Sequence, residues 1–282
     1  MHPVTNKVRR LRFGLIGAGR IADSYVQAFR AASNATLVAV ADTREDAARA
    51  MAEAAGCPSF PSHRQMLEQV ECDAVVVATP PASHPDICMD ALRRKLHVLC
   101  EKPVCLTTEA ATAIRDAAEQ NGVLFTMASK FRYAEDVIRA KALVTSGVLG
   151  DIVLFENTFM SRVDMTTRWN SKPAIAGGGV LIDNGTHSVD IMRYFLGPLQ
   201  EVYAAECPRT QALTVEETVR VLVKSASGVM GSMDLSWSLN KEVDHYIVIY
   251  GSHGTLRVGW KQSTYRQSSA ADWVTFGNGY NK

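Results

Sequence analysis

The sequence predicts an α/β protein in two parts: a doubly wound parallel sheet, followed by an α+β part with an open, largely antiparallel sheet. Two observations predict this fold class. Up to about residue 130, short apolar runs alternate with segments of helical periodicity, as in a parallel sheet that is covered on both faces. Beyond that point, β-rich runs follow one another with tight turns such as Ser227-Gly228 between them, which is typical of antiparallel strands.

In the first part, buried strands are expected at the apolar runs, and helices are expected between them. Thr107 or Thr108 is suited to capping the last of these helices, and Gly56 and Gly122 are ordinary helix stops. The expected strands are Leu11–Ile16, Thr36–Ala41, Asp73–Ala78, His97–Cys100 and Val123–Met127, and the expected helices are Ile21–Ala32, Arg44–Ala55, His84–Arg93 and Glu109–Gln120.

In the second part, strands outnumber helices. Helical periodicity predicts Ala134–Ser146, which ends at Gly147, and Val180–Phe195. The expected strands are Asp151–Ser161, Gln200–Cys207, Thr214–Lys224, Val229–Ser238, Asp244–Tyr250 and Thr255–Val258.

Length and charge limit the classes of function. A chain of 282 residues allows two domains at roughly 150 residues each, and we expect them at residues 1–130 and 131–282. Lys and Arg number 30 against 29 Asp and Glu, a net charge of +1. This balance argues against a nucleic-acid partner and favours a small molecule.

The cysteines and the apolar runs indicate the compartment. The 6 cysteines are scattered without a C-x-x-C pair, which favours reduced thiols over a metal site. No apolar run of signal-peptide length follows the basic N-terminus, and no stretch approaches the ~20 apolar residues that span a bilayer. We therefore expect a cytoplasmic protein that does not enter a membrane.

A glycine-rich turn follows the first expected strand and predicts a dinucleotide site in a Rossmann-type domain. Residues Gly17–Ala22 match the pattern G-x-G-x-x-A: Gly17 permits the turn, and Gly19 lets the backbone approach a pyrophosphate. Asp42 ends the next strand about 20 residues later, where an acidic side chain binds a ribose. A purely structural glycine turn is the alternative. The residues expected to contact the cofactor here are Gly17, Gly19, Arg20, Ile21, Asp42 and Arg44.

Asp42 and Arg44 bear on which dinucleotide binds. A carboxylate accepts hydrogen bonds from ribose hydroxyls and repels a 2′-phosphate, so Asp42 favours NAD. Arg44 leaves NADP open, because a guanidinium pairs with phosphate. Its other interpretation is a solvated arginine in the first turn of a helix.

The loop Ala78–His84 is also expected to face the cofactor, since ligands of open α/β sheets bind outside the carboxyl ends of the strands. Thr79 and Pro80 are candidates for contact with the ribose or the nicotinamide. His84 is either a further cofactor contact or, with Ser83, only the cap and first turn of the next helix.

Glu101-Lys102-Pro103 follows another expected strand at the same edge of the sheet. A lysine there hydrogen-bonds a substrate hydroxyl and stabilises an alkoxide-like transition state. The proline is a candidate for a cis peptide bond that directs the lysine into the cleft. A surface turn is the alternative. Glu101 and Lys102 are both counted among the expected cofactor contacts.

The segment Gly177–Asp190 carries a polar set at helical spacing. Asp183, His187 and Asp190 fall at i, i+4 and i+7 and so share one face of the expected helix. Imidazole ordinarily titrates near neutral pH, which suits His187 to general base catalysis. Asp183 either orients that imidazole or binds substrate. The alternative is a helix with a capping aspartate and a structural histidine.

Taken together, Gly17–Ala22, Glu101–Pro103 and Gly177–Asp190 resemble, in order and context, the Gfo/Idh/MocA family of NAD(P)-dependent oxidoreductases, which includes glucose–fructose oxidoreductase and inositol dehydrogenase. The resemblance spans nearly the whole chain. It implies that Lys102, Asp183 and His187 are catalytic residues. It also implies a homodimer or homotetramer that assembles through the C-terminal sheet.

The reaction that the resemblance implies is hydride transfer between a nicotinamide cofactor and a secondary alcohol or ketone of a sugar, cyclitol or sugar derivative, without a metal. In oxidation, His187 accepts the hydroxyl proton, Lys102 hydrogen-bonds the oxygen and Asp183 helps to hold the geometry. The expected substrate contacts are Lys102, Lys130, Arg168, Trp169, Asp183, Asn184 and His187, with Arg132, Asn157 and Arg162 also expected near the cleft.

Two other functions stay open at this point. One is an enzyme of the same fold that works chiefly as a reductase of a ketone, an imine or a diol-derived substrate. The other is a cofactor-binding sensor or regulatory protein without turnover. The presence of Lys102, Asp183 and His187 favours catalysis, because a non-catalytic protein has no physical reason to keep all three.

The C-terminal end departs from the family pattern. Members continue into further helices, whereas this chain stops at Lys282 after residues without helical periodicity. We therefore expect a second domain that is truncated at its C-terminus, with consequences for stability and assembly.

Overall fold

The computed structural model describes residues 9–280. The first residues of the basic N-terminus and the chain end at Lys282 lie outside the described residues. The chain divides into two compact units, Met1–Ala128 and Ser129–Lys282. Each unit has its own sheet and its own buried core.

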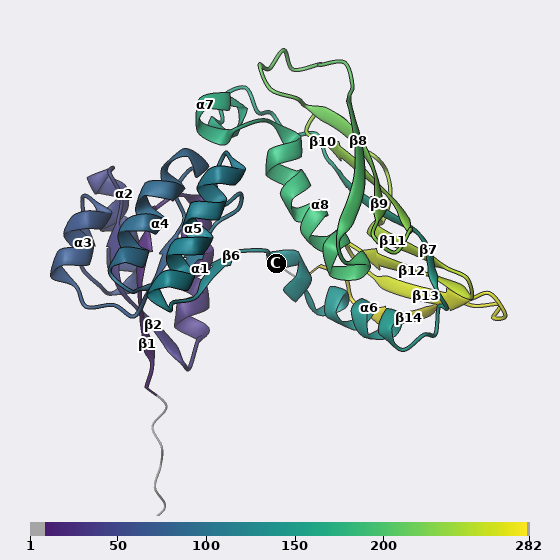
Figure 1. The fold of residues 1–282 in the computed structure, drawn as a ribbon, viewed down its shortest axis with the longest axis horizontal. Coiled ribbons are helices and arrows are strands. Elements are labelled where there is room, and N and C mark those ends of the chain that lie inside the picture. The colour runs from purple at the N-terminus through teal and green to yellow at the C-terminus, as the bar shows by residue number, and fades with distance from the viewer. Residues whose placement is uncertain (1–8, 281–282) are drawn as a thin grey trace, which may run out of the picture. The chain divides into compact units, whose positions relative to one another are not determined.

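Unit 1 confirms the doubly wound parallel sheet (Figure 1). Within residues 9–128, six strands lie in the order β3-β2-β1-β4-β5-β6, and all neighbours pair in parallel. The strands are β1 (Leu11–Ile16), β2 (Ala35–Ala41), β3 (Ser59–Phe60), β4 (Ala74–Val77), β5 (His97–Cys100) and β6 (Phe125–Met127), and the helices are α1 (Arg20–Ala31), α2 (Glu45–Ala55), α3 (His63–Gln69), α4 (His84–Arg93) and α5 (Thr108–Asn121), with a short 3₁₀ turn, η1 (Pro81–Ser83).

Strand β4 explains why this sheet needs helices on both faces. Val75 and Val77 belong to one apolar cluster, and Val76 belongs to another, as the alternation of side chains along a strand requires. Helix α1 packs Ala22 and Val26 into the second cluster. Continuous apolar runs therefore form strands that are buried on both sides.

The helix ends follow the residues that the sequence singled out. The Thr107 hydroxyl accepts a hydrogen bond from the Ala110 amide at 3.2 Å and caps α5. Gly56 and Gly122 end α2 and α5 in the left-handed conformation. Strand β3 and helix α3 were not predicted, because such short elements carry too little periodicity to be recognised.

Unit 2 contains a mixed, mostly antiparallel sheet. In its described residues, eight strands lie in the order β14-β13-β12-β11-β7-β10-β9-β8, and β7 with β10 is the parallel pair. The strands are β7 (Ile152–Met160), β8 (Leu199–Glu206), β9 (Thr218–Ser225), β10 (Met230–Ser236), β11 (His245–Gly251), β12 (Gly254–Gly259), β13 (Ser263–Gln267) and β14 (Val274–Gly277), and the helical segments are η2 (Lys130–Tyr133), α6 (Glu135–Thr145), η3 (Trp169–Ser171), α7 (Pro173–Ala176) and α8 (Val180–Leu196).

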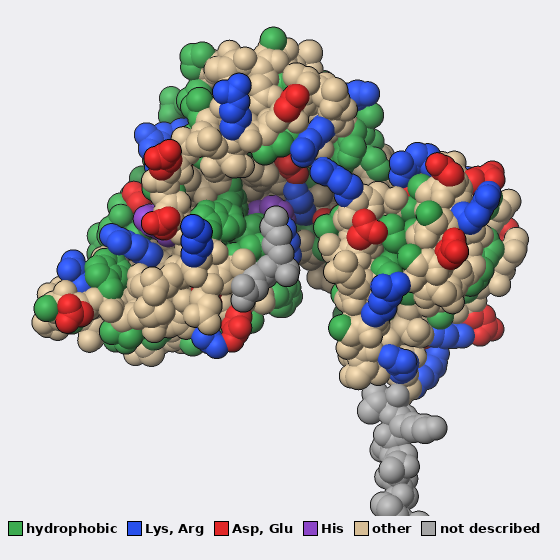
Figure 2. Space-filling model, turned by 180° about the vertical axis from the view of Figure 1, so that it is seen from behind, with side chains coloured by type: hydrophobic (Ala, Val, Ile, Leu, Met, Phe, Trp, Pro, Cys, Tyr) green, Lys and Arg blue, Asp and Glu red, His purple; other side chains and the backbone are tan. Residues whose placement is uncertain are grey.

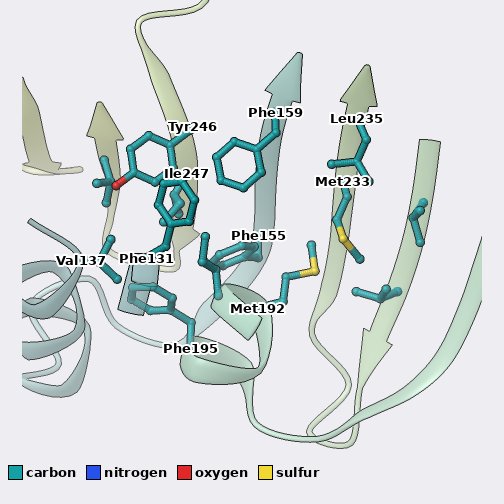
Figure 3. Packing of buried hydrophobic residues seen from close by; sticks show 14 of the residues in the cluster. Phe131, Val137, Phe155, Phe159, Met192, Phe195, Met233, Leu235, Tyr246 and Ile247 are labelled. Atoms are coloured by element: carbon teal, nitrogen blue, oxygen red, sulfur yellow. The ribbon is translucent and has the colours of Figure 1, made fainter. Parts of the chain in front are cut away.

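Helix α8 covers one face of this sheet and supplies much of its core (Figures 1 and 3). Met192 and Phe195 of α8 pack toward Phe155 of β7, and Phe131 of η2 belongs to the same apolar cluster. The rings of Phe155 and Phe195 have centroids 5.6 Å apart. The apolar side of α8 therefore packs against the sheet, in part through large rings.

A buried aspartate holds the end of the described chain. Asp136 of α6 is 4% exposed, and its carboxylate accepts hydrogen bonds from the Ser263 hydroxyl at 2.5 Å and the Gly279 amide at 2.8 Å. Residues near the C-terminal end are thus fixed to the first helix of the unit. These residues form β13 and β14, which agrees with their lack of helical periodicity.

The charged side chains are mixed on the surface. Figure 2 displays Lys and Arg interspersed with Asp and Glu over the visible face of each unit. Among residues 9–280, no group of three or more His, Cys, Asp or Glu side chains is placed to hold a metal ion. Within the same range, the helices are all too short or too polar to cross a membrane.

Candidate active site

The glycine-rich turn of unit 1 has the geometry of a phosphate cradle. Gly17 has a φ of +103°, and a Cβ there would lie 2.6 Å from the Ala78 carbonyl oxygen, so only glycine fits. A Cβ on Gly19 would meet no atom within 4 Å, and Gly19 is the N-cap of α1, which therefore has no side-chain cap. The amides that open α1 and the space beside Gly19 therefore fit the pyrophosphate of a dinucleotide. Arg20 and Ile21 are exposed in this first turn.

Asp42 is held beside that turn by backbone amides. Its two carboxylate oxygens accept hydrogen bonds from the Ala18 amide at 2.7 Å and the Arg44 amide at 2.8 Å. Burial acts to raise the pKa of Asp42, but these amides and the Arg44 guanidinium outweigh it and hold the pKa below its usual value. Asp42 is therefore a charged acceptor next to the cradle, as ribose binding requires.

Arg44 folds back over Asp42. Its guanidinium Nε lies 3.4 Å from the carboxylate, and its side chain remains largely exposed. The arginine therefore offsets part of the negative charge at the position that distinguishes NAD from NADP.

His84 joins two loops at the carboxyl edge of the sheet. Its ring is fully buried, with Nε2 2.7 Å from the Thr79 carbonyl oxygen and Nδ1 2.9 Å from the Pro103 carbonyl oxygen. The Ser83 hydroxyl lies 2.8 Å from the Thr79 hydroxyl oxygen, and Pro80 is exposed. His84 therefore begins α4 and ties the loop after β4 to the loop after β5.

Lys102 lies in a turn that begins directly after β5. The Lys102–Pro103 peptide bond is cis, as expected from the sequence. The amide of Glu101 continues the sheet by donating to the Val77 carbonyl at 2.8 Å. The carboxylate of Glu101 then accepts a hydrogen bond from the Tyr25 hydroxyl at 2.8 Å and from the Lys102 amide at 3.1 Å. Lys102 itself is half-buried.

The predicted cofactor residues of unit 1 thus gather at one edge of the sheet. Gly17 follows β1, Asp42 follows β2, Thr79 follows β4 and Glu101 follows β5. Parallel strands end at the same edge, so residues far apart in the sequence meet there.

In unit 2, the start of α8 is fixed by Glu216. One oxygen of its carboxylate accepts hydrogen bonds from the Gly179 amide at 2.8 Å and the Leu181 amide at 3.1 Å. The Glu216 carbonyl accepts from the Val180 amide at 2.9 Å. A Cβ on Gly179 would lie 2.0 Å from that carbonyl, so this close approach needs glycine. The negative charge also suits the positive end of the helix.

Asp183 and His187 lie half-buried in the first half of α8. The His187 ring packs against the Phe131 ring in a T-shaped arrangement, with a centroid distance of 5.0 Å and an interplanar angle of 78°. Phe131 also contacts the rings of Phe159 and Tyr246. The imidazole therefore lies at the border of an aromatic cluster, which limits its movement.

Asp190, the third residue of the polar face, has a different partner. Its carboxylate accepts hydrogen bonds from both Nε and Nη2 of Arg132, with the Nε contact at 2.9 Å. This two-point ion pair joins α8 to η2. Arg132 was expected near the cleft, and the structure assigns its guanidinium to this pair.

The other predicted substrate residues are spread over unit 2. Lys130 is exposed, with its ammonium group 5.2 Å from the Phe131 ring centroid. Trp169 is 40% exposed in η3, and Arg168 and Asn184 are half-buried. Asn157 is buried in β7 and donates to the Tyr246 carbonyl at 2.8 Å. Arg162 is exposed after β7.

Sequence reasoning missed Tyr25 and Glu216. Their partners lie 76 residues away, in Glu101, and 37 residues away, in Gly179. Neither residue belongs to a motif, so no local pattern could reveal these contacts.

Comparisons with known proteins cover both units. Residues 11–129 match the model of an oxidoreductase family with an NAD-binding Rossmann fold, and residues 137–257 match the model of the GFO/IDH/MocA C-terminal domain. The D-glucoside 3-dehydrogenase of Escherichia coli is 35% identical over 191 residues, which are 66% of this chain and 54% of that protein. The chain therefore spans about half the length of this relative.

A second relative and a solved structure match over more of the chain. The myo-inositol 2-dehydrogenase of Thermotoga maritima is 27% identical over 87% of this chain and 74% of that protein. The WlbA dehydrogenase of Bordetella pertussis, solved in complex with NADH and UDP-GlcNAcA, is 28% identical, with a TM-score of 0.82 over 89% of this chain and 78% of that chain.

Proposed function

The chain belongs to the Gfo/Idh/MocA family of NAD-binding oxidoreductases, and from this premise we propose hydride transfer between NAD and a secondary alcohol or ketone of a sugar, cyclitol or sugar derivative. The observation that carries the proposal is that both family domains are present in order, each with its own candidate catalytic group. Lys102 follows β5 in the first, and His187 lies on α8 in the second.

The cofactor residues fit NAD. Gly17 permits the tight turn, Gly19 leaves room for the pyrophosphate, and the charged Asp42 accepts hydrogen bonds from the ribose hydroxyls. When bound, the nicotinamide ring supplies the hydride acceptor or donor. Further contacts from this edge of the sheet are proposed for Arg20, Ile21, Arg44, Thr79, Pro80, Glu101 and Lys102, while His84 supports the loops from within.

Side chains of the protein accept the hydroxyl proton of the substrate and stabilise the charge on its oxygen. In oxidation, His187 accepts the hydroxyl proton of the substrate as a general base. The Lys102 ammonium hydrogen-bonds the same oxygen and stabilises the negative charge that develops on it. Asp183 helps to hold the substrate and the imidazole in line, and the contact with Phe131 limits the positions of the imidazole.

The proposed substrate is a small polyhydroxylated molecule. The relatives include proteins named for a glucoside and for an inositol, which differ in ring chemistry but share adjacent secondary hydroxyls. Asn184 and Lys130 offer polar contacts, and Trp169 offers an exposed aromatic face to a sugar ring. The Arg168 guanidinium is suited to pairing with the carboxylate or phosphate of an acidic or phosphorylated sugar.

A substrate panel tests this function. Purified protein is mixed with NAD and, one at a time, with D-glucose, a methyl glucoside, glucose 6-phosphate, myo-inositol and a UDP-hexuronate, and NADH is followed by absorbance. We expect turnover with at least one compound, and faster turnover with NAD than with NADP. Tight binding of NADH without oxidation of any of these compounds would instead favour the sensor.

We further propose that the protein acts in the cytoplasm as a homodimer or homotetramer, with a second copy of the chain against the open face of the unit 2 sheet. Tyr203 and Leu222 are paired on neighbouring strands of that face and are 67% and 43% exposed. The ion pair of Arg220 with Asp234 lies on the next pair of strands, so a polar pair stands beside these apolar side chains. Sedimentation velocity tests the assembly.

A further inference from the structure

Glu101 is the link between two motifs that the proposed function treats separately. One oxygen of its carboxylate accepts the Tyr25 hydroxyl at 2.8 Å, and the other accepts the Lys102 amide at 3.1 Å. The side chain therefore bridges helix α1 and the backbone of the residue that carries the proposed catalytic ammonium. Rotation of the carboxylate would break one or both of these hydrogen bonds.

Tyr25 is well placed to hold that carboxylate. It lies in the second turn of α1, the helix that starts at the phosphate cradle, and its ring packs in the apolar cluster of α1 and α2. Burial and the adjacent charge of Glu101 raise the pKa of Tyr25 well above its usual value. The hydroxyl therefore stays protonated and acts as a donor across the working pH range.

The other side of the turn is held by His84, which is fully buried and contacts the Pro103 carbonyl at 2.9 Å. With both supports in place, the Lys102 backbone is fixed on either side of its own Cα. The direction of the Lys102 side chain is then set by groups that do not touch substrate.

We propose that Tyr25 is a positioning residue for Lys102, acting through the carboxylate of Glu101. The proposal rests on the proposed function, because it assumes that Lys102 acts on the reacting oxygen. Tyr25 itself contacts neither cofactor nor substrate in this role. Loss of its hydroxyl lets the Glu101 carboxylate rotate and the Lys102 turn relax, while the phosphate cradle at Gly17 and Gly19 is unchanged.

The test removes only the hydroxyl, as Tyr25→Phe. Loss of a hydrogen bond to a charged group corresponds to a change of about tenfold or more in a rate or equilibrium constant. We expect kcat to fall about tenfold on the best sugar of the panel, with the Kd for NADH changed less than about twofold. Tyr250→Phe is the matched control, because Tyr250 also donates to a glutamate, Glu156, at 3.2 Å, but in the sheet of unit 2. It should leave kcat unchanged.

A double-variant cycle separates positioning from general support of the fold. In a Lys102→Ala background there is no ammonium left to position, so Tyr25→Phe should cause no further loss of kcat. An equal loss in both backgrounds, or no loss in the wild-type background, would overturn the positioning role alone. Full turnover by Lys102→Ala would overturn the proposed function and the positioning role together.

A second measurement does not need a substrate. Amide hydrogen exchange, followed with NADH bound, reports the hydrogen bond from the Lys102 amide to Glu101. Exchange at Lys102 should accelerate several-fold in Tyr25→Phe, while the amides of β1 keep their wild-type rates. Unchanged protection of Lys102 would overturn the proposal.

Discussion

The turn that carries Lys102 and the helix that carries His187 are held in different ways. The turn leaves β5 and has no regular hydrogen-bond ladder of its own, so side chains from α1 and α4 support it through Glu101 and Pro103. The helix makes its own backbone hydrogen bonds and is tied at its start by Glu216. A catalytic group on a loop therefore depends on several distant residues, whereas one on a helix is held largely by the backbone hydrogen bonds of the helix itself.

The loop that carries Glu216 is itself stabilised by the next residue, Glu217. Glu216 is followed by Glu217, which is fully buried and accepts hydrogen bonds from the Thr210 amide at 2.8 Å, the Leu213 amide at 3.2 Å and the Ser238 hydroxyl at 2.7 Å. Glu217 thus organises the loop that presents Glu216 to the helix. The Glu217 carboxylate therefore stabilises the loop, and the Glu216 carboxylate caps α8.

The largest expected effect comes from removing the two proposed catalytic groups themselves. Lys102→Ala and His187→Asn should each lower kcat by about 10²–10⁴-fold, because charge stabilisation and general base catalysis are lost. Binding of NADH, measured by fluorescence titration, should remain nearly intact in both. Near-normal turnover in either variant would contradict its assigned role.

A smaller effect is expected from Glu217→Gln, in thermodynamic stability rather than in chemistry. The amide group of glutamine cannot accept the hydrogen bonds that the second oxygen accepted, so unfolding free energy should fall by about 3 kcal/mol. Urea unfolding followed by circular dichroism measures it. Glu201→Gln is the control, because Glu201 pairs with Lys224 on the surface and should matter little.

The contribution of Glu217 to the free energy of unfolding should also depend on pH. Burial acts to raise the pKa of Glu217, but the surrounding amide and hydroxyl donors lower it to about 2, below the ordinary value of 4.5. Its contribution is therefore fully present above about pH 4.5 and is lost as the pH falls toward 2. Unfolding measured from pH 6 to pH 3 should reveal this loss in the wild type and a weaker one in Glu217→Gln. Parallel curves would refute the assignment.

The smallest expected effect comes from Glu216→Gln. The amide oxygen still caps α8, but the charge that favours the helix start is lost, at a cost of about 0.5–1 kcal/mol. Because α8 supports itself beyond its first turn, kcat should change less than about threefold. A loss as large as that of Tyr25→Phe would remove the contrast between the helix and the turn.

The sequence predicted most elements of both units because their periodicities are local. The strand that contains Val75–Val77 and the helix that contains Asp183 and His187 were recognised from residues within a few positions of one another. The motifs at Gly17, Glu101 and Gly177 likewise carry their chemistry in short segments. Strands β3, β13 and β14 and the short α3 and α7 were missed, because their patterns are too brief or too irregular.

The sequence by itself determined the fold class, the cradle at Gly17–Ala22, and the identity of Lys102 and His187 as candidate catalytic groups. Only the tertiary structure decided what holds those groups: Tyr25 and His84 for the turn, and Glu216 for the helix. The reason is physical. Periodicity and turn chemistry act between neighbours in the chain, whereas a supporting hydrogen bond joins residues that become neighbours when the chain folds.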